Sequence, residues 1–158
     1  MKESEIKKHL EEAEKSPRLL AAAVAGLPEK ILRFKPSPDK WCIREIVGHL
    51  ADLEIVYGFR IRQIIAEEKP VIMPMDQNAW ARSLGYMEAP VPELVALFGV
   101  NRHHNLRLLK NLKSVDFAKG AYHPELKREM TLENILVVLD EHTASHLAQI
   151  EGLKKAAK

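Results

Sequence analysis

His142 and His146 lie four residues apart in the segment DEHTASHLAQI, near the end of the chain. A helix brings positions i and i+4 onto one face, and the leucine and isoleucine neighbours predict that this face is buried. Burying an unpaired imidazole costs solvation free energy, which a bound metal ion would offset, because neutral imidazole nitrogen is a good ligand for zinc, nickel, copper or iron. The spacing therefore indicates either a metal site or two partly buried histidines that bond to backbone or carboxylate groups.

A third histidine, His49, could join this pair from another helix. It follows Ile46 by three residues and precedes Leu53 by four, at the margin of an apolar stripe. Three histidine ligands would leave coordination positions of the metal open, which is the pattern of a catalytic site and not of a closed structural one. No spacing rule by itself links residue 49 to residues 142 and 146.

The other four histidines are weaker candidates for ligands. His9 falls on a charged amphipathic segment, where we expect it to be solvated. His103 and His104 are adjacent, so at most one of them can face the interior from a helix. His123 precedes a proline, and we expect it to cap or fold that loop.

Helical periodicity predicts the elements that must carry these residues. Asp76 is a candidate N-cap of one short helix, and Thr131 of the last long helix. Ser16 and Pro17 predict that the first helix is broken or restarted there, and no strand is predicted. The expected long helices cover residues 3–26, 43–68, 91–113 and 131–156. The predicted fold class is therefore all-α, a four-helix bundle in a single domain of residues 1–158.

The long connection over residues 69–90 bears on the order of the helices. His49 lies early in its helix, whereas His146 lies in the second half of the last one. The two side chains reach the same depth of the bundle more easily if these helices are antiparallel. We therefore predict long crossover connections, with helices two and three parallel and helix four antiparallel to both.

Composition excludes several classes of function. The chain has 158 residues and one cysteine, Cys42, so it can form no internal disulfide and suits a reducing cytosol. The 24 basic and 22 acidic side chains leave a net charge of +2, which does not favour nucleic acid as a partner. No apolar run approaches the roughly 18 residues of a membrane span, and the start has no apolar signal segment. We expect a soluble, cytoplasmic protein with no nucleic-acid or membrane partner.

Two segments of the chain resemble the DinB-like superfamily, a group of metal-binding helical bundles. They are KPSPDKWCIREIVGHLADLE (35–54) and HPELKREMTLENILVVLDEHTASHLAQIEGLK (123–154). The most specific feature is W-x-x-x-E-x-x-x-H followed far along the chain by H-x-x-x-H-x-x-Q-I. The resemblance implies that His49, His142 and His146 bind one divalent ion, nickel or zinc. Cys42 departs from the serine that the family often has there, and a thiol is a poor helix cap.

The resemblance also implies a reaction. Characterised relatives are thiol-dependent S-transferases and isomerases, so a small-molecule thiol and an electrophile are the expected substrates. Relatives often form dimers, and a homodimer is expected. Two alternatives stay open: a metal-dependent hydrolase, if the activated nucleophile is water, and a non-enzymatic stress protein whose metal stabilises the fold.

Several polar residues near the predicted site have two interpretations each. Asp52, one turn beyond His49, could accept an imidazole N–H or be a surface carboxylate. Asn101 and Asn105 interrupt an apolar seam and could line a substrate cavity or form an internal hydrogen bond. Arg102 matches an arginine common in the family and could bind an anionic group or pair with an acidic side chain. Trp41 is expected to pack a loop over the bundle.

Overall fold

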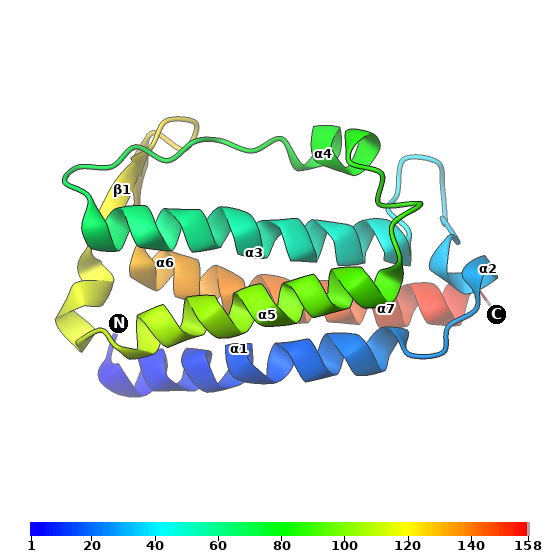
Figure 1. Ribbon diagram of the computed structural model, residues 1–158, viewed down its shortest axis with the longest axis horizontal. Coiled ribbons are helices and arrows are strands. Elements are labelled where there is room, and N and C mark those ends of the chain that lie inside the picture. Colours follow the sequence, from blue (N-terminus) through cyan, green and yellow to red (C-terminus); the bar gives the residue numbers. More distant parts are fainter. Residues whose placement is uncertain (158) are drawn as a thin grey trace.

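Four long helices form the bundle in the computed structural model, which describes residues 1–157 (Figure 1). Lys158, the last residue of the predicted domain, lies outside the described residues. The long helices are α1 (Glu3–Val24), α3 (Ile43–Ala66), α5 (Val91–Lys110) and a last helix made of α6 (Leu132–Val137), a π turn (Val138–His142) and α7 (Thr143–Ala156). The short helices are α2 (Glu29–Leu32), α4 (Gln77–Ser83) and a 3-10 turn (Ser114–Ala118). The predicted four-helix bundle is confirmed.

The predicted helix directions are also confirmed. Figure 1 shows α3 and α5 running in the same direction, with α1 and the last helix running the opposite way. The connection over residues 67–90 returns along the length of α3 and carries α4. This return places the start of α5 beside the start of α3, so the two helices are parallel.

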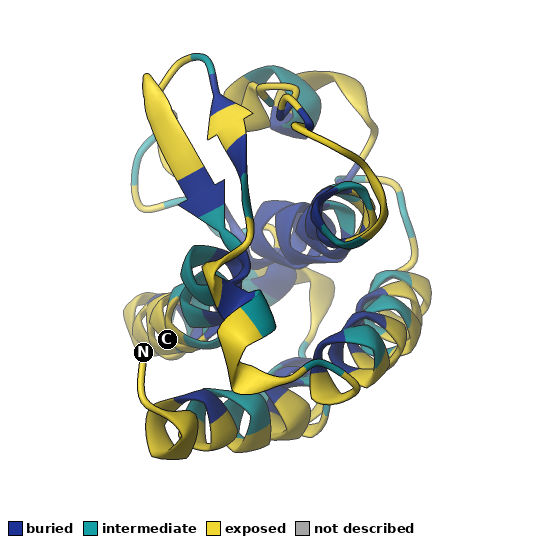
Figure 2. Ribbon diagram, turned by 90° about the vertical axis from the view of Figure 1, so that its left-hand side faces the viewer, coloured by how far each residue is buried: buried dark blue, intermediate teal, exposed yellow. Residues whose placement is uncertain are grey.

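The first half of α3 is the most deeply buried part of the molecule, because helices cover one side and the 67–90 connection covers the other. Every residue from 42 to 51 is buried. Gly48 permits this double coverage, since the ring of Tyr86, from the connection, packs directly on its Cα. In Figure 2 the helices turn buried faces toward a common centre and exposed faces outward. No described helix is long and apolar enough to cross a membrane.

The predicted break of the first helix at Pro17 is wrong, since α1 continues through it. A proline in a helix removes the N–H that would bond to the carbonyl four residues earlier, here that of Ala13. Two other groups replace it: the Ser16 hydroxyl donates to the Ala13 carbonyl at 2.7 Å and Arg102 Nη1 donates to it at 3.2 Å. A side chain from α5 therefore keeps α1 continuous.

The expectation of no strand is also wrong. Strands β1 (Gly120–His123) and β2 (Arg128–Thr131) form an antiparallel hairpin, and Val71 bridges to the outer side of β1. Each strand has only four residues and the turn between them is charged, so their alternation was too short to detect. His123 is buried, and its Nδ1 accepts a 3.4 Å hydrogen bond from the Leu126 backbone, as expected for a residue that folds this loop.

Both predicted side-chain caps are confirmed. Asp76 accepts hydrogen bonds from the backbone N–H groups of Asn78 (3.0 Å) and Ala79 (2.9 Å) at the start of α4. Thr131 accepts from the Asn134 backbone at 3.2 Å, and the Asn134 side chain accepts from the Thr131 backbone at 3.1 Å. These caps begin α4 and the last helix where the sequence placed them.

Substituting Gly48 tests the docking of the connection on α3. A Cβ at this position would overlap the Tyr86 ring, much closer than van der Waals contact allows, and this ring is only 4% exposed. We expect Gly48→Ala to lower the free energy of unfolding in urea by about 1–3 kcal/mol, the usual cost of overpacking. Gly152→Ala is the control, because a Cβ there meets nothing within 4 Å and should stabilise α7 by up to about 1 kcal/mol. Equal effects of the two variants would contradict the packing of Tyr86 on α3.

Candidate metal site

Three histidines converge between α3 and the last helix. His49 lies in the buried first half of α3 and is 2% exposed. His142 is the last residue of the π turn, and His146 follows one turn later in α7. π turns are rare and are often found at functional sites. The sequence predicted a regular α-helix through this region, whereas the structure has a π turn over Val138–His142.

The three imidazole rings contact one another. The ring centroid of His49 lies 5.3 Å from that of His142 and 5.1 Å from that of His146. The centroids of His142 and His146 are 4.4 Å apart. One nitrogen from each ring lies within 4.8 Å of the other two. The Nε2 atoms of His142 and His146 are 3.2 Å apart. The structure thus brings together the three residues that the sequence singled out.

The arrangement fits a bound metal ion. His49 Nε2 is buried and has no hydrogen-bond partner among residues 1–157, although buried polar atoms almost always have one. Gln149 Oε1 lies 2.9 Å from His146 Nδ1, so it can accept that N–H and leave Nε2 free to bind a metal. Three imidazole nitrogens are a suitable ligand set for zinc or nickel. The motif H-x-x-Q contained Gln149, but the sequence alone did not assign it this role.

All three imidazoles have lowered pKa values. Burial, together with the nearby His146 and His142, lowers the pKa of His49 to about 3. Burial, with His146 and Arg102, lowers the pKa of His142 to about 4. Burial also lowers the pKa of His146, against the opposing effect of its bond to Gln149. The rings are therefore neutral at pH 7, which is the form that binds metal.

Trp41 packs against the hydrophobic core, as expected, and it also forms part of the wall of this site. Its ring centroid lies 4.8 Å from that of His49 and 6.3 Å from that of His146, with the His146 ring stacked at an interplanar angle of 16°. The indole thus lies against two of the three candidate ligands. The W-x-x-x-E-x-x-x-H motif held the signal for this, since it places Trp41 just before the helix that carries His49.

Asp52 bonds to Tyr86 and not to an imidazole. The Tyr86 hydroxyl donates to Asp52 Oδ2 at 2.5 Å. Burial and the hydrogen bond to the Asp52 carboxylate raise the pKa of Tyr86, so the phenol keeps its proton at neutral pH. Asp52 therefore fastens the 67–90 connection to α3, close to His49 but without a hydrogen bond to it.

Arg102 and Asn105 form an internal polar network with Glu54. Asn105 Nδ2 donates to the Glu54 carbonyl at 2.8 Å and to Glu54 Oε2 at 3.1 Å. Arg102 donates to Glu54 Oε1 from Nε at 2.9 Å and from Nη2 at 2.6 Å. Asn101 donates to the Leu97 carbonyl of its own helix at 3.0 Å. Asn105 thus forms the internal hydrogen bond and Arg102 has the acidic partner, whereas the bond of Asn101 is exposed and neither interpretation of Asn101 is observed.

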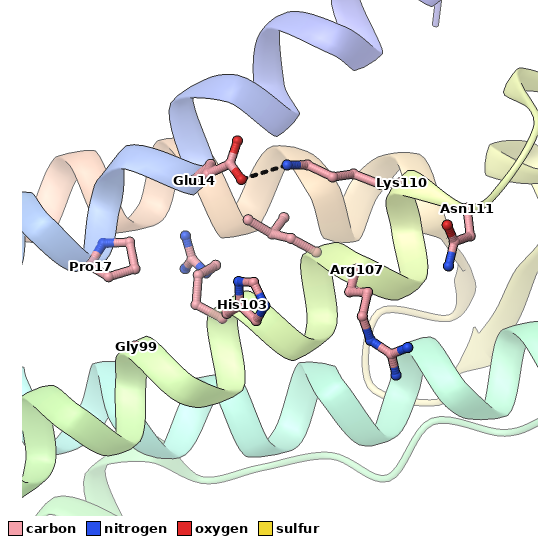
Figure 3. Close-up of a pocket in the computed structure, with 9 residues that line it drawn as sticks. Glu14, Pro17, Gly99, His103, Arg107, Lys110 and Asn111 are labelled. Atoms are coloured by element: carbon pink, nitrogen blue, oxygen red, sulfur yellow. Dashed lines mark hydrogen bonds and ion pairs between the residues drawn. The ribbon is translucent and has the colours of Figure 1, made fainter.

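A groove of about 410 Å³ lies between α1 and α5 (Figure 3). An ion pair between Lys110 Nζ and Glu14 Oε1, 2.6 Å apart, spans it. The lining residues are Glu14, Pro17, Gly99, Arg102, His103, Leu106, Arg107, Lys110 and Asn111. None of the three converging histidines is among them, so this groove is separate from the candidate metal site.

The remaining histidines lie elsewhere. His103 and His104 are both exposed on α5. The expectation that His9 is solvated is wrong, since its Nδ1 lies 2.7 Å from Asp140 Oδ2 and both side chains are mostly buried. Asp140 belongs to the π turn, so this contact joins α1 to the segment that carries His142.

The lowered pKa values predict that the metal-free protein loses stability in mild acid. Below about pH 6.5 the unfolded chain takes up protons on its histidines, while folded His49 stays neutral down to about pH 3. Unfolding therefore binds protons, and the free energy of unfolding should fall by about 1 kcal/mol per pH unit from His49 alone between pH 6.5 and 5. Urea unfolding with a chelator, at a series of pH values, measures this slope. His49→Gln should show a shallower slope, and equal slopes would contradict a buried neutral His49.

Comparison with known proteins identifies the family of this chain. Residues 12–150 match the DinB superfamily. A curated relative from Bacillus subtilis, "Putative metal-dependent hydrolase YfiT", is 30% identical over 148 residues, 94% of this chain and 83% of that protein. A relative from Bacillus licheniformis with the same general name is 30% identical over 156 residues, 97% of this chain and 87% of that one.

A solved structure extends the similarity to the whole fold. Bacillus subtilis YfiT, described as "a probable metal-dependent hydrolase with an unusual four-helix bundle topology", matches with a TM-score of 0.93 at 29% identity. The match covers 99% of this chain and 89% of that one. The present protein therefore belongs to the DinB superfamily, as the motifs around its three histidines predicted.

Proposed function

We propose that this protein binds one divalent metal ion through His49, His142 and His146 and is an enzyme that transfers a small-molecule thiol to an electrophile. The observation that carries the metal site is the buried, unpartnered Nε2 of His49 beside two converging imidazoles. The names of the relatives support a divalent metal as cofactor. Imidazole ligands suit nickel and zinc alike.

A bound ion of this kind supplies Lewis acidity, which lowers the pKa of a nucleophile beside it. The chain itself contributes the position of the three rings and their neutral form at pH 7. Trp41 shields one side of the cluster from water, because its ring lies against His49 and His146. Three protein ligands leave room for a nucleophile, which is typical of catalytic sites.

The surroundings of the histidines suit a thiol better than water. A thiol ionises near pH 8.5 and water near 15.7, so water needs the larger decrease in pKa and benefits more from a carboxylate base. No carboxylate joins the three imidazoles within residues 1–157. Asp52 is bonded to Tyr86, and Glu54 is paired with Arg102. These engaged carboxylates support S-transfer over hydrolysis.

A metal-dependent hydrolase at the same site is the second candidate, and the names of the relatives favour it. A protein that binds metal without catalysis is the third. The homodimer and the identities of the thiol and the electrophile stay predictions.

Metal content tests the site directly. Protein purified without a histidine tag should contain about one nickel or zinc ion per chain, measured by elemental mass spectrometry, because three neutral imidazoles form a strong site. His49→Ala and His146→Ala should lose the ion. His103→Ala is the matched control, since His103 is exposed on α5, and it should keep the ion. Wild-type protein that stays folded and binds neither metal after dialysis would contradict the ligand assignment.

Activity assays separate the candidate reactions. Metal-loaded protein is incubated with an electrophilic reporter, with and without bacillithiol, mycothiol or glutathione. S-transfer predicts product only with a thiol, at a rate at least about tenfold above that of His146→Ala, since loss of a ligand removes the metal. Product formed equally well without a thiol would identify a hydrolase. A loaded protein inactive in every assay would favour the non-enzymatic alternative.

A further inference from the structure

One guanidinium group at the centre of the bundle bonds to the other three long helices. Arg102, on α5, and its partner Glu54, on α3, are each 1% exposed. Besides Glu54, the guanidinium donates to Ser16 Oγ of α1 at 2.6 Å and to Thr143 Oγ1 of α7 at 3.0 Å. Arg102 therefore joins elements that are far apart in the sequence, including the helix that carries His142 and His146.

Its contact with Thr143 falls at the end of the π turn. In a regular α-helix the Thr143 backbone N–H would donate to the Leu139 carbonyl. Here it donates to the Asp140 carbonyl. The Thr143 hydroxyl donates to the Leu139 carbonyl instead, at 3.0 Å. The Thr143 hydroxyl oxygen also accepts a hydrogen bond from Arg102, so the hydroxyl links the guanidinium to the backbone of the π turn.

This link lies directly beside a candidate metal ligand. Thr143 follows His142 in the chain, and Arg102, Glu54, His142 and Thr143 line one small cavity of about 10 Å³. A space of that size holds about one water molecule and leaves little freedom for these side chains to move. A change at the Thr143 hydroxyl can therefore reach His142 through the turn that ends at it.

We propose that Arg102 and Thr143 are positioning residues for the metal site, which hold the π turn so that His142 faces His49 and His146. This inference rests on the proposed metal site. The alternative is that the network only stabilises the bundle, as buried polar networks often do. The two differ in one respect: a positioning role lowers metal affinity beyond any loss of stability.

Ser16 and Thr143 offer a matched pair of variants for this test. Each hydroxyl is buried, accepts from Arg102 and donates to a backbone carbonyl of its own helix. Only Thr143 adjoins the π turn. Thr143→Val and Ser16→Ala therefore remove equivalent hydrogen bonds, but only the first should disturb His142.

The affinity of each full-length variant for nickel or zinc alone is measured by competition with a chromophoric chelator. The melting temperature of each metal-free variant is measured separately, in excess chelator. Thr143→Val should weaken metal affinity by about tenfold or more, the usual effect of residues that orient ligands. Ser16→Ala should stay within about twofold of wild type, although both variants melt at lower temperature. Thr143→Ser, which keeps the hydroxyl, should restore the affinity.

Each result has a separate meaning. Equal metal affinities of Thr143→Val and Ser16→Ala, with a loaded wild type, would overturn the positioning role and leave the metal site intact. Failure of Thr143→Ser to restore affinity would overturn it as well. A wild type that binds neither metal would instead overturn the proposed function, and the positioning role with it.

Discussion

The buried ion pair between Arg102 and Glu54 is the interaction on which the rest of the bundle depends. Removing two charges from water is costly, and their attraction offsets this cost only when their remaining hydrogen-bonding groups are also satisfied. Here Asn105 completes the carboxylate, and Ser16 and Thr143 complete the guanidinium. Because each long helix contributes at least one of these groups, the network links all four long helices at one level of the bundle.

Both irregularities in the long helices occur where they meet this pair. Pro17 leaves the carbonyl of Ala13 without its helical donor, and the π turn does the same for Leu139. In each case a neighbouring hydroxyl that is bonded to Arg102 supplies the missing donor. Local preferences that would break or distort an isolated helix are thus accommodated by one buried cation, and such departures from regular structure are common near functional sites.

Unlike the ion pair between Arg102 and Glu54, the histidine site has a buried polar atom without a partner among residues 1–157. Burial keeps the imidazoles neutral and leaves His49 Nε2 without a partner, so the site as it stands costs stability. A metal ion would recover that cost, which couples metal affinity to folding. Trp41 and Gln149 hold the rings, while Arg102 connects them to the centre of the bundle. The polar network and the metal site are therefore neighbouring parts of one buried polar layer.

The sequence by itself determined the helical bundle through its apolar periodicity, which is a local signal. The long 69–90 connection predicted the helix directions, and the resemblance of two motifs to a known family joined His49 to His142 and His146, since no spacing rule does so. The sequence could not show the hairpin, whose strands are too short for a periodic pattern, or the continuity of α1 at Pro17. Nor could it choose between the two interpretations of Asp52 and Arg102. Tertiary structure decided these points, because the partner of a buried polar group comes from another helix, and only packing determines which partner lies within hydrogen-bonding distance.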